Sequence, residues 1–184
     1  AFEYEWYGGL KTSLKLKAEE NEACGNLHFI PLSMSSTDAN GIKIRTTEAS
    51  LQLRYAPGEK LINSKQRRVA INRETPIFAL THTFGVKGVL GGDYNYNFTE
   101  ATIYKRFFLN SWGDLNVDAR AGAQWNKVPY PLLIMPAVNL SYLAADGVFN
   151  LINNMEFLND RYASLDIWWN MNGKIFNRIP LFKK

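Results

Sequence analysis

One stretch decides the fold of this chain: Asp114-Leu115-Asn116-Val117-Asp118-Ala119-Arg120-Ala121-Gly122-Ala123-Gln124-Trp125. Its odd-numbered positions are apolar, whereas its even-numbered positions carry three charges, two amides and a glycine. Successive side chains of a β-strand point to opposite faces, so this alternation predicts a strand with one apolar and one polar face. Twelve residues at about 3.3 Å each span about 40 Å, enough to cross a bilayer core of about 30 Å at the tilt of barrel strands.

The same alternation recurs along the chain and predicts about seven to eight antiparallel strands. We expect them at residues 2–6, 10–19, 43–55, 77–84, 94–108, 114–125 and 161–172, with a possible short segment at 28–30. Gly8 and Gly9 predict a tight hairpin turn between the first two strands. Within 94–108 the apolar positions change parity beyond Glu100, which predicts a β-bulge there. The chain is therefore expected to be all-β.

The connections between these strands differ in length in a regular way. They are short at residues 8–9 and 110–113 but long at 20–42, 85–93 and 126–160, and only 57–75 breaks the alternation. Outer-membrane barrels have short periplasmic turns and long external loops, and aromatic residues lie at both membrane interfaces. Aromatics indeed occur near the expected strand ends, at Trp6, Tyr55, Tyr94, Phe108, Trp125 and Trp169. The sequence thus predicts an antiparallel transmembrane β-barrel.

Segment 126–160 is predicted to be a long external loop. Its three prolines, Pro129, Pro131 and Pro136, interrupt regular structure. Its apolar run 132–135 needs burial, so we expect the loop to fold back partly over or into the barrel.

A strand that crosses lipid keeps its charges out of the hydrocarbon, which assigns the two faces. The expected lipid-facing residues are Leu115, Val117, Ala119, Ala121, Ala123, Leu165, Ile167 and Trp169. The expected lumen-facing residues are Asn116, Asp118, Arg120, Gln124, Asp166 and Asn170. By this assignment an arginine at Ala119 destabilises the protein by roughly 2–4 kcal/mol, and one at Gln124 has little effect.

Composition bounds the remaining possibilities. The 184 residues are 46% hydrophobic with a net charge of +4, and the mean hydropathy is −0.24. No window approaches 18 consecutive apolar residues, so no transmembrane helix is expected, although barrel strands escape this criterion because their apolar residues alternate. The basic cluster 65–68 is interpreted as a solvated loop, with contact to lipid head groups or an acidic partner as the alternative. Nucleic acid is not an expected partner.

The sequence carries no recognisable catalytic or cofactor motif. His28 and His82 lie in different segments without metal-ligand spacing, and Cys24 is the single cysteine, so neither a metal site nor an internal disulfide is expected. There is no GxSxG, P-loop or GxGxxG motif. Carboxylates such as Asp114 and Asp118 are interpreted as setting the polarity of a lumen. We therefore expect a protein that is not an enzyme and has no cofactor.

The two ends of the chain suggest a single barrel segment, residues 1–184, that is truncated at both ends. No signal peptide is visible, the first strand pattern begins at residue 1, and residues 181–184 end as a strand is beginning. A barrel with unpaired strand edges is not viable in lipid. Residues 1–184 alone are therefore not expected to form a closed barrel.

Several segments resemble a known family more specifically than the alternation does. They are Leu53-Arg54-Tyr55-Ala56-Pro57-Gly58-Glu59-Lys60, Lys87-Gly88-Val89-Leu90-Gly91-Gly92-Asp93-Tyr94, Lys127-Val128-Pro129-Tyr130-Pro131-Leu132-Leu133, Phe157-Leu158-Asn159-Asp160-Arg161-Tyr162-Ala163-Ser164-Leu165 and Phe176-Asn177-Arg178-Ile179-Pro180-Leu181. In this order they resemble the C-terminal barrel of Bacteroidota outer-membrane proteins described as carboxypeptidase-regulatory-like, with a domain of unknown function.

The resemblance implies a bacterial outer-membrane location and a larger barrel, distantly similar to the surface-antigen superfamily of outer-membrane assembly and translocation proteins. It implies a role in envelope protein assembly, translocation or transport, with outer-membrane lipid and other envelope proteins as partners. The arginine motif in the inward-folded loop of that superfamily is not evident, and no catalytic residue is implied. Two alternatives remain open from the residues themselves: a complete eight-stranded structural or adhesive barrel, and a soluble lipocalin-like or sandwich binding module.

Overall fold

A computed structural model describes residues 1–22, 43–63, 68–145, 147–174 and 178. Its strands are β1 (Phe2–Glu5), β2 (Leu10–Glu22), β3 (Lys43–Tyr55), β4 (Leu61–Asn63), β5 (Arg68–Ala70), β6 (Ile77–Gly85), β7 (Tyr96–Phe108), β8 (Asp114–Gln124) and β9 (Arg161–Asn170). Short 3-10 turns are η1 (Tyr7–Gly9), η3 (Asn110–Trp112) and η4 (Tyr130–Leu132). The chain is thus all-β. Cys24, His28 and the expected 28–30 segment lie outside the described residues.

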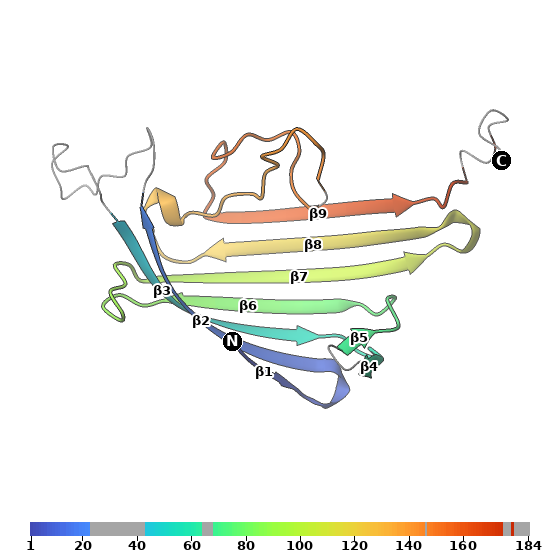
Figure 1. Cartoon of the computed structure of the whole chain (residues 1–184), viewed down its shortest axis with the longest axis horizontal. Helices are drawn as coiled ribbons and strands as arrows, with labels where there is room; N and C mark the ends of the chain where they lie inside the picture. Colours follow the sequence, from blue (N-terminus) through green and yellow to red (C-terminus); the bar gives the residue numbers. More distant parts are fainter. Residues whose placement is uncertain (23–42, 64–67, 146, 175–177, 179–184) are drawn as a thin grey trace.

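Seven strands form one antiparallel sheet in the order β1-β2-β3-β6-β7-β8-β9, and β4 with β5 forms a separate small hairpin. Every strand of the large sheet pairs with its neighbour in the described chain, so the topology is a meander (Figure 1). Within the described residues the sheet is open, because β1 and β9 lie at its opposite edges. The strand predictions were close, and the main difference is that β4–β5 forms inside the 57–75 link, where no strand was expected.

The pair registers place most of the aliphatic strand residues on one face of the sheet. Leu115 pairs with Phe107 and Trp169, and Ala119 pairs with Ile103 and Leu165. Directly paired residues share a face, so this apolar face continues across every strand. Its larger side chains are Phe2, Tyr4, Leu14, Leu16, Leu51, Leu53, Tyr55, Phe78, Leu80, Phe84, Ile103, Phe107, Leu115, Val117, Leu165, Ile167 and Trp169.

That apolar face is exposed, and the described residues enclose almost no conventional core. Leu16, Leu165 and Ile167 are 73%, 63% and 60% exposed. Only three of the described hydrophobic residues are buried, and none of the described large side chains is fully buried. In addition, none of the described helical turns has the length or apolarity that a membrane-spanning helix needs. An apolar face of this extent requires a cover other than water.

The opposite face is polar and carries most of the strand charges. It presents Asp118 and Asp166, which are paired across β8 and β9, together with Arg120 and Glu100 from β8 and β7. The predicted bulge beyond Glu100 is wrong, because the register of β7 with both neighbours runs through this residue without a break. The apolar positions of β7 change parity because Tyr96 and Phe98 lie on the polar face, where they line a cavity beneath segment 126–160.

Two hairpin turns on one rim of the sheet depend on glycine. Gly113, between η3 and β8, has φ +84°, and a Cβ there would lie 1.9 Å from the carbonyl oxygen of Asn170. Gly9 has φ +83°, and its Cβ would lie 2.1 Å from the carbonyl oxygen of Ala56. A side chain is excluded at both positions by backbone conformation and by space. These turns fix the registers of β1–β2 and β7–β8.

Candidate functional site

Segment 126–160, which connects β8 to β9, folds back over the polar face. A hydrogen bond from Gln124 N to Asp160 O, 2.7 Å, ties the end of the segment to β8. Trp125, just before the segment, donates its N–H to Asn97 O at 2.9 Å. The two halves of the segment pair through Ile134 and Asn159. Figure 1 shows the segment (orange) arching next to β9. The fold-back that the prolines and the apolar run 132–135 predicted is therefore observed for this segment.

A cavity of about 650 Å³ lies between this segment and the polar face of the sheet. The segment contributes apolar side chains, including Leu132, Ile134, Phe149 and Phe157. The sheet contributes three carboxylates, Glu48, Glu100 and Asp166, and one guanidinium, Arg120. Other sheet residues that line the cavity include Thr83, Tyr96, Phe98, Gln124, Tyr162 and Ser164. The cavity thus has an apolar wall opposite an acidic one.

Two tyrosines, each lying across a glycine of the neighbouring strand, form part of the acidic wall. Tyr162 is paired with Gly122, where a Cβ would lie 2.3 Å from the tyrosine ring. Tyr96 is paired with Gly85 in the same way, with a corresponding distance of 2.2 Å. The Tyr162 hydroxyl donates a 2.7 Å hydrogen bond to Glu100 Oε2. The glycines therefore let the rings lie flat on the sheet and orient a cavity carboxylate.

Gln124 is the buried polar residue of the cavity wall. It is 7% exposed, and its Nε2 atom is fully buried without a hydrogen-bond partner. Buried side-chain donors nearly always have a partner, so an unpaired one within the wall of a cavity is informative. The expectation that an arginine at Gln124 has little effect stays a prediction.

Arg120 contributes a cation to the cavity wall that is already matched. Its Nε and Nη2 atoms bind the Asp118 carboxylate at 3.1 Å and 2.8 Å. The Asp118 side chain is only 14% exposed. The carboxylates of Glu48, Glu100 and Asp166 therefore leave the described cavity wall with an excess of negative charge.

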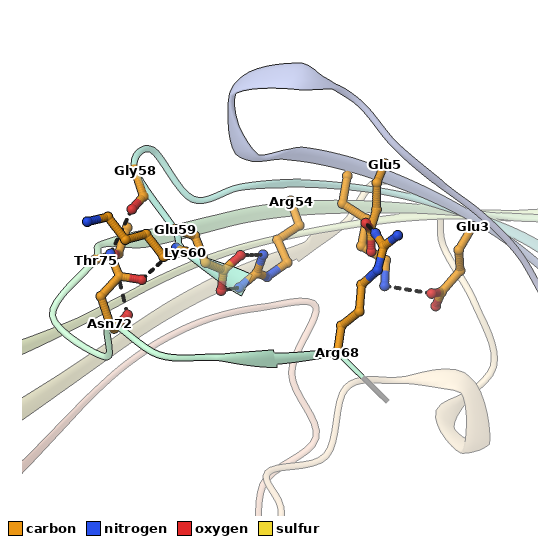
Figure 2. A network of polar contacts seen from close by, with 10 residues as sticks. Glu3, Glu5, Arg54, Gly58, Glu59, Lys60, Arg68, Asn72 and Thr75 are labelled. Carbon is orange, nitrogen blue, oxygen red and sulfur yellow. Dashed lines mark hydrogen bonds and ion pairs between the residues drawn. The ribbon is translucent and has the colours of Figure 1, made fainter. Parts of the chain in front are cut away.

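A second segment covers the same polar face at the opposite rim of the sheet. The link between β3 and β6, which contains β4 and β5, is fastened by Arg54 and Glu59 through two 2.7 Å hydrogen bonds. Arg68 forms an ion pair with Glu5 of β1. Asn72 closes the link on itself by binding Lys60 N and Gly58 O, each at 2.7 Å. Figure 2 shows these contacts, which join β1, β3 and the link.

The structure places the predicted site residues on the faces expected from their parity. All eight predicted lipid-facing residues share the apolar face, and all six predicted lumen-facing residues share the polar face. Of the latter, only Arg120, Gln124 and Asp166 line the cavity. What each face contacts in the cell stays a prediction. The cavity residues contributed by β3, β6 and β7 were missed, because alternation within a strand does not show which polar residues a loop will cover.

A family model matches residues 30–184, most of the chain; it is described as the C-terminal domain of a family of unknown function, DUF5686. The chain belongs to this family. Neither a curated protein nor a solved structure gave a match. The DUF5686 match covers β3 to β9, and so includes both walls of the cavity and the link. It names no activity.

In the part of the chain that the structure describes, no three His, Cys, Asp or Glu side chains come together in a way that could hold a metal ion. His82 instead pairs with Thr99 through a 2.7 Å Nδ1–Oγ1 hydrogen bond and packs against Phe84. The candidate functional site is the cavity between segment 126–160 and the polar face.

Proposed function

We propose that this chain forms part of the wall of a β-barrel in the bacterial outer membrane, with its apolar face toward lipid and its polar face toward the lumen. The observation that carries the proposal is the apolar face itself, which crosses all seven strands and is exposed in the described chain. A soluble monomer rarely exposes an apolar patch of more than a few hundred Å². Hydrocarbon is the cover that accepts such a face without further contacts.

The dimensions of the apolar face agree with this proposal. Leu115 to Ala123 is eight steps of about 3.3 Å, or about 26 Å along the strand, which becomes about 20 Å at a tilt of 35–45°. Trp125 follows at one end of β8, and Trp112 lies beyond its other end beside Trp169, with ring centroids 6.0 Å apart. These tryptophans extend the face toward the roughly 25 Å apolar band of membrane barrels, which is flanked by aromatic girdles.

Several polar groups on the apolar face are paired, as lipid would require. Thr99 binds both His82 and the Trp125 indole N–H, the latter at 2.8 Å. The ammonium group of Lys105 reaches out of the strand to the carbonyl oxygen of Glu74, 2.6 Å away. An unsatisfied polar group in hydrocarbon costs several kcal/mol, so these pairings favour a lipid-facing role.

The edges of the sheet define what a barrel would still need. β1 and β9 each have one neighbour in the described residues, so closure requires further strands to pair with them. The cellular role we propose, in envelope protein assembly, translocation or transport, rests on the resemblance of the quoted motifs. The proposed partners are outer-membrane lipid and other envelope proteins.

Single-cysteine variants of β8 test the orientation. We expect cysteines at Leu115, Val117, Ala119, Ala121 and Ala123 to be shielded from a membrane-impermeant thiol reagent in liposomes and quenched by a lipid-phase spin label. Cysteines at Asn116 and Asp118 should show the opposite behaviour. Labelling of the cysteine at Leu115, or at the other apolar positions, by the membrane-impermeant reagent would exclude the membrane proposal in favour of a soluble module. A protein that stays monomeric in buffer without detergent would exclude it as well.

A further inference from the structure

We infer that the cavity beneath segment 126–160 binds a primary ammonium group that carries an adjacent carbonyl and an apolar side chain, which is the chemistry of a peptide N-terminus with an apolar first residue. The inference goes beyond the membrane proposal. It depends on how the segment lies against the polar face of the sheet, and not on what covers the apolar face.

The charge of the cavity selects a cation. Glu48, Glu100 and Asp166 line it, and Arg120 is the one cation among the described lining residues. That guanidinium is held by two hydrogen bonds to Asp118. The three remaining carboxylates therefore set a negative potential in the cavity, which attracts and orients a positive group. A primary ammonium offers three donors, and these match several carboxylate oxygens.

The unpaired amide of Gln124 is an independent observation that selects an acceptor next to the cation. Its Nε2 atom is buried without a partner, in a side chain that lines the cavity. Gln124 pairs with Phe98, and Gly122 pairs with Glu100. Gln124 and Glu100 are therefore diagonal neighbours, about 7–8 Å apart at their backbones. An α-amino carbonyl spans this spacing, with its ammonium on Glu100 and its carbonyl oxygen on the Gln124 amide.

The opposite wall selects an apolar side chain. Leu132, Ile134, Phe149 and Phe157 all come from the folded-back segment and face the acidic wall across the cavity. A volume of about 650 Å³ lies within the roughly 300–1,000 Å³ of small-ligand sites. Such sites combine an apolar lining with a few directed polar groups, which is the composition found here.

Calorimetric titration of the folded protein in the uncharged detergent dodecyl maltoside tests the inference with three probes. These are leucyl-leucinamide, its N-acetyl derivative and hexylamine. Leucyl-leucinamide should bind at least tenfold more tightly than the acetylated peptide, which lacks the charge, and more tightly than hexylamine, which lacks the carbonyl. Equal affinity for the free and acetylated peptides would overturn the inference, as would the absence of binding by leucyl-leucinamide. This comparison needs no variant.

Substitutions then assign the affinity to the cavity. Glu100→Gln and Asp166→Asn should each weaken leucyl-leucinamide about five- to tenfold, whereas Gln124→Leu should weaken it without changing hexylamine. Glu3→Gln is the matched control, because Glu3 lies on the polar face but pairs with Lys11 away from the cavity. Circular dichroism checks the folding of each variant. Affinity that none of the three cavity substitutions changes, or that the control reduces equally, would place binding elsewhere and contradict the inference.

Discussion

Arg54 and Glu59 face each other through two parallel hydrogen bonds, Nη1 to Oε2 and Nη2 to Oε1, each 2.7 Å. The Glu59 side chain is only 9% exposed. The pair joins the end of β3 to the link that follows it, and so holds that link against the polar face (Figure 2). A two-point guanidinium–carboxylate contact of this kind fixes orientation as well as distance.

Low pH should release this link. The hydrogen bonds from Arg54 hold the pKa of the Glu59 carboxyl below its ordinary value, and burial opposes them with a smaller effect. A depressed pKa stabilises the folded link above the ordinary glutamate pKa of about 4.3, and this stabilisation is lost as the pH falls through the depressed value. Hydrogen-exchange protection of the Ile71 amide, which donates to Lys60 O, should be constant above about pH 5 and decrease in more acidic solution.

Glu59→Gln separates this effect from general acid unfolding. The variant should lose about 1–3 kcal/mol of protection at neutral pH, since it leaves Arg54 without its charged partner. Its remaining protection should not depend on the protonation of residue 59. Glu3→Gln, in an exposed pair with Lys11, should keep the wild-type profile. Protection in Glu59→Gln that matches wild type at neutral pH would show that the pair does not hold the link.

An arginine in the middle of the apolar face should destabilise the protein strongly if that face meets lipid. Ala119→Arg places a charge between Ile103 and Leu165, and we expect a loss of roughly 2–4 kcal/mol in the free energy of unfolding from lipid vesicles. Thr81→Arg is the control, because Thr81 lies mid-strand on the polar face between Gln52 and Glu100. Equal losses for the two variants would argue against a lipid-facing surface.

Gly113 should be far less tolerant than Gly88, although both have φ +84°. Gly88→Ala incurs only the conformational penalty of a positive φ, about 1 kcal/mol, because nothing lies within 4 Å of its Cβ position. Gly113→Ala adds the overlap with the Asn170 carbonyl and should lose about 1–3 kcal/mol more. Denaturant titration of both variants measures the difference. Similar denaturation midpoints for the two variants would mean that the end of β9 moves away from residue 113 without loss of stability.

The Gly122–Tyr162 contact should appear as an energetic coupling. Gly122→Ala pushes a Cβ into the tyrosine ring and breaks the hydroxyl contact with Glu100, so it should destabilise wild type. In a Tyr162→Ala background the same substitution should have little effect, which gives a coupling of about 1–2 kcal/mol. A double-mutant cycle of unfolding free energies checks this. Additive losses would show that the ring does not rest on Gly122 in solution.

The sequence by itself determined the strands and their faces. The alternation in 114–125 required a strand because only an extended backbone places Leu115, Ala119 and Ala123 on one side and Asp118 and Arg120 on the other. The same reasoning located β3 and β9 closely, and Gly8 with Gly9 located the first hairpin turn. These features could be predicted because they depend on neighbours a few residues apart in the chain.

Only the tertiary structure decided which polar residues share a site. Tyr96 and Phe98 break the alternation of β7, and from sequence this break indicated a bulge, whereas their aromatic rings belong to a cavity wall completed by segment 126–160. The ion pair of Arg68 with Glu5 and the cover over Gln124 likewise join residues far apart in the chain. Such contacts depend on how a loop returns over a sheet, a three-dimensional relationship that no local period of side chains encodes.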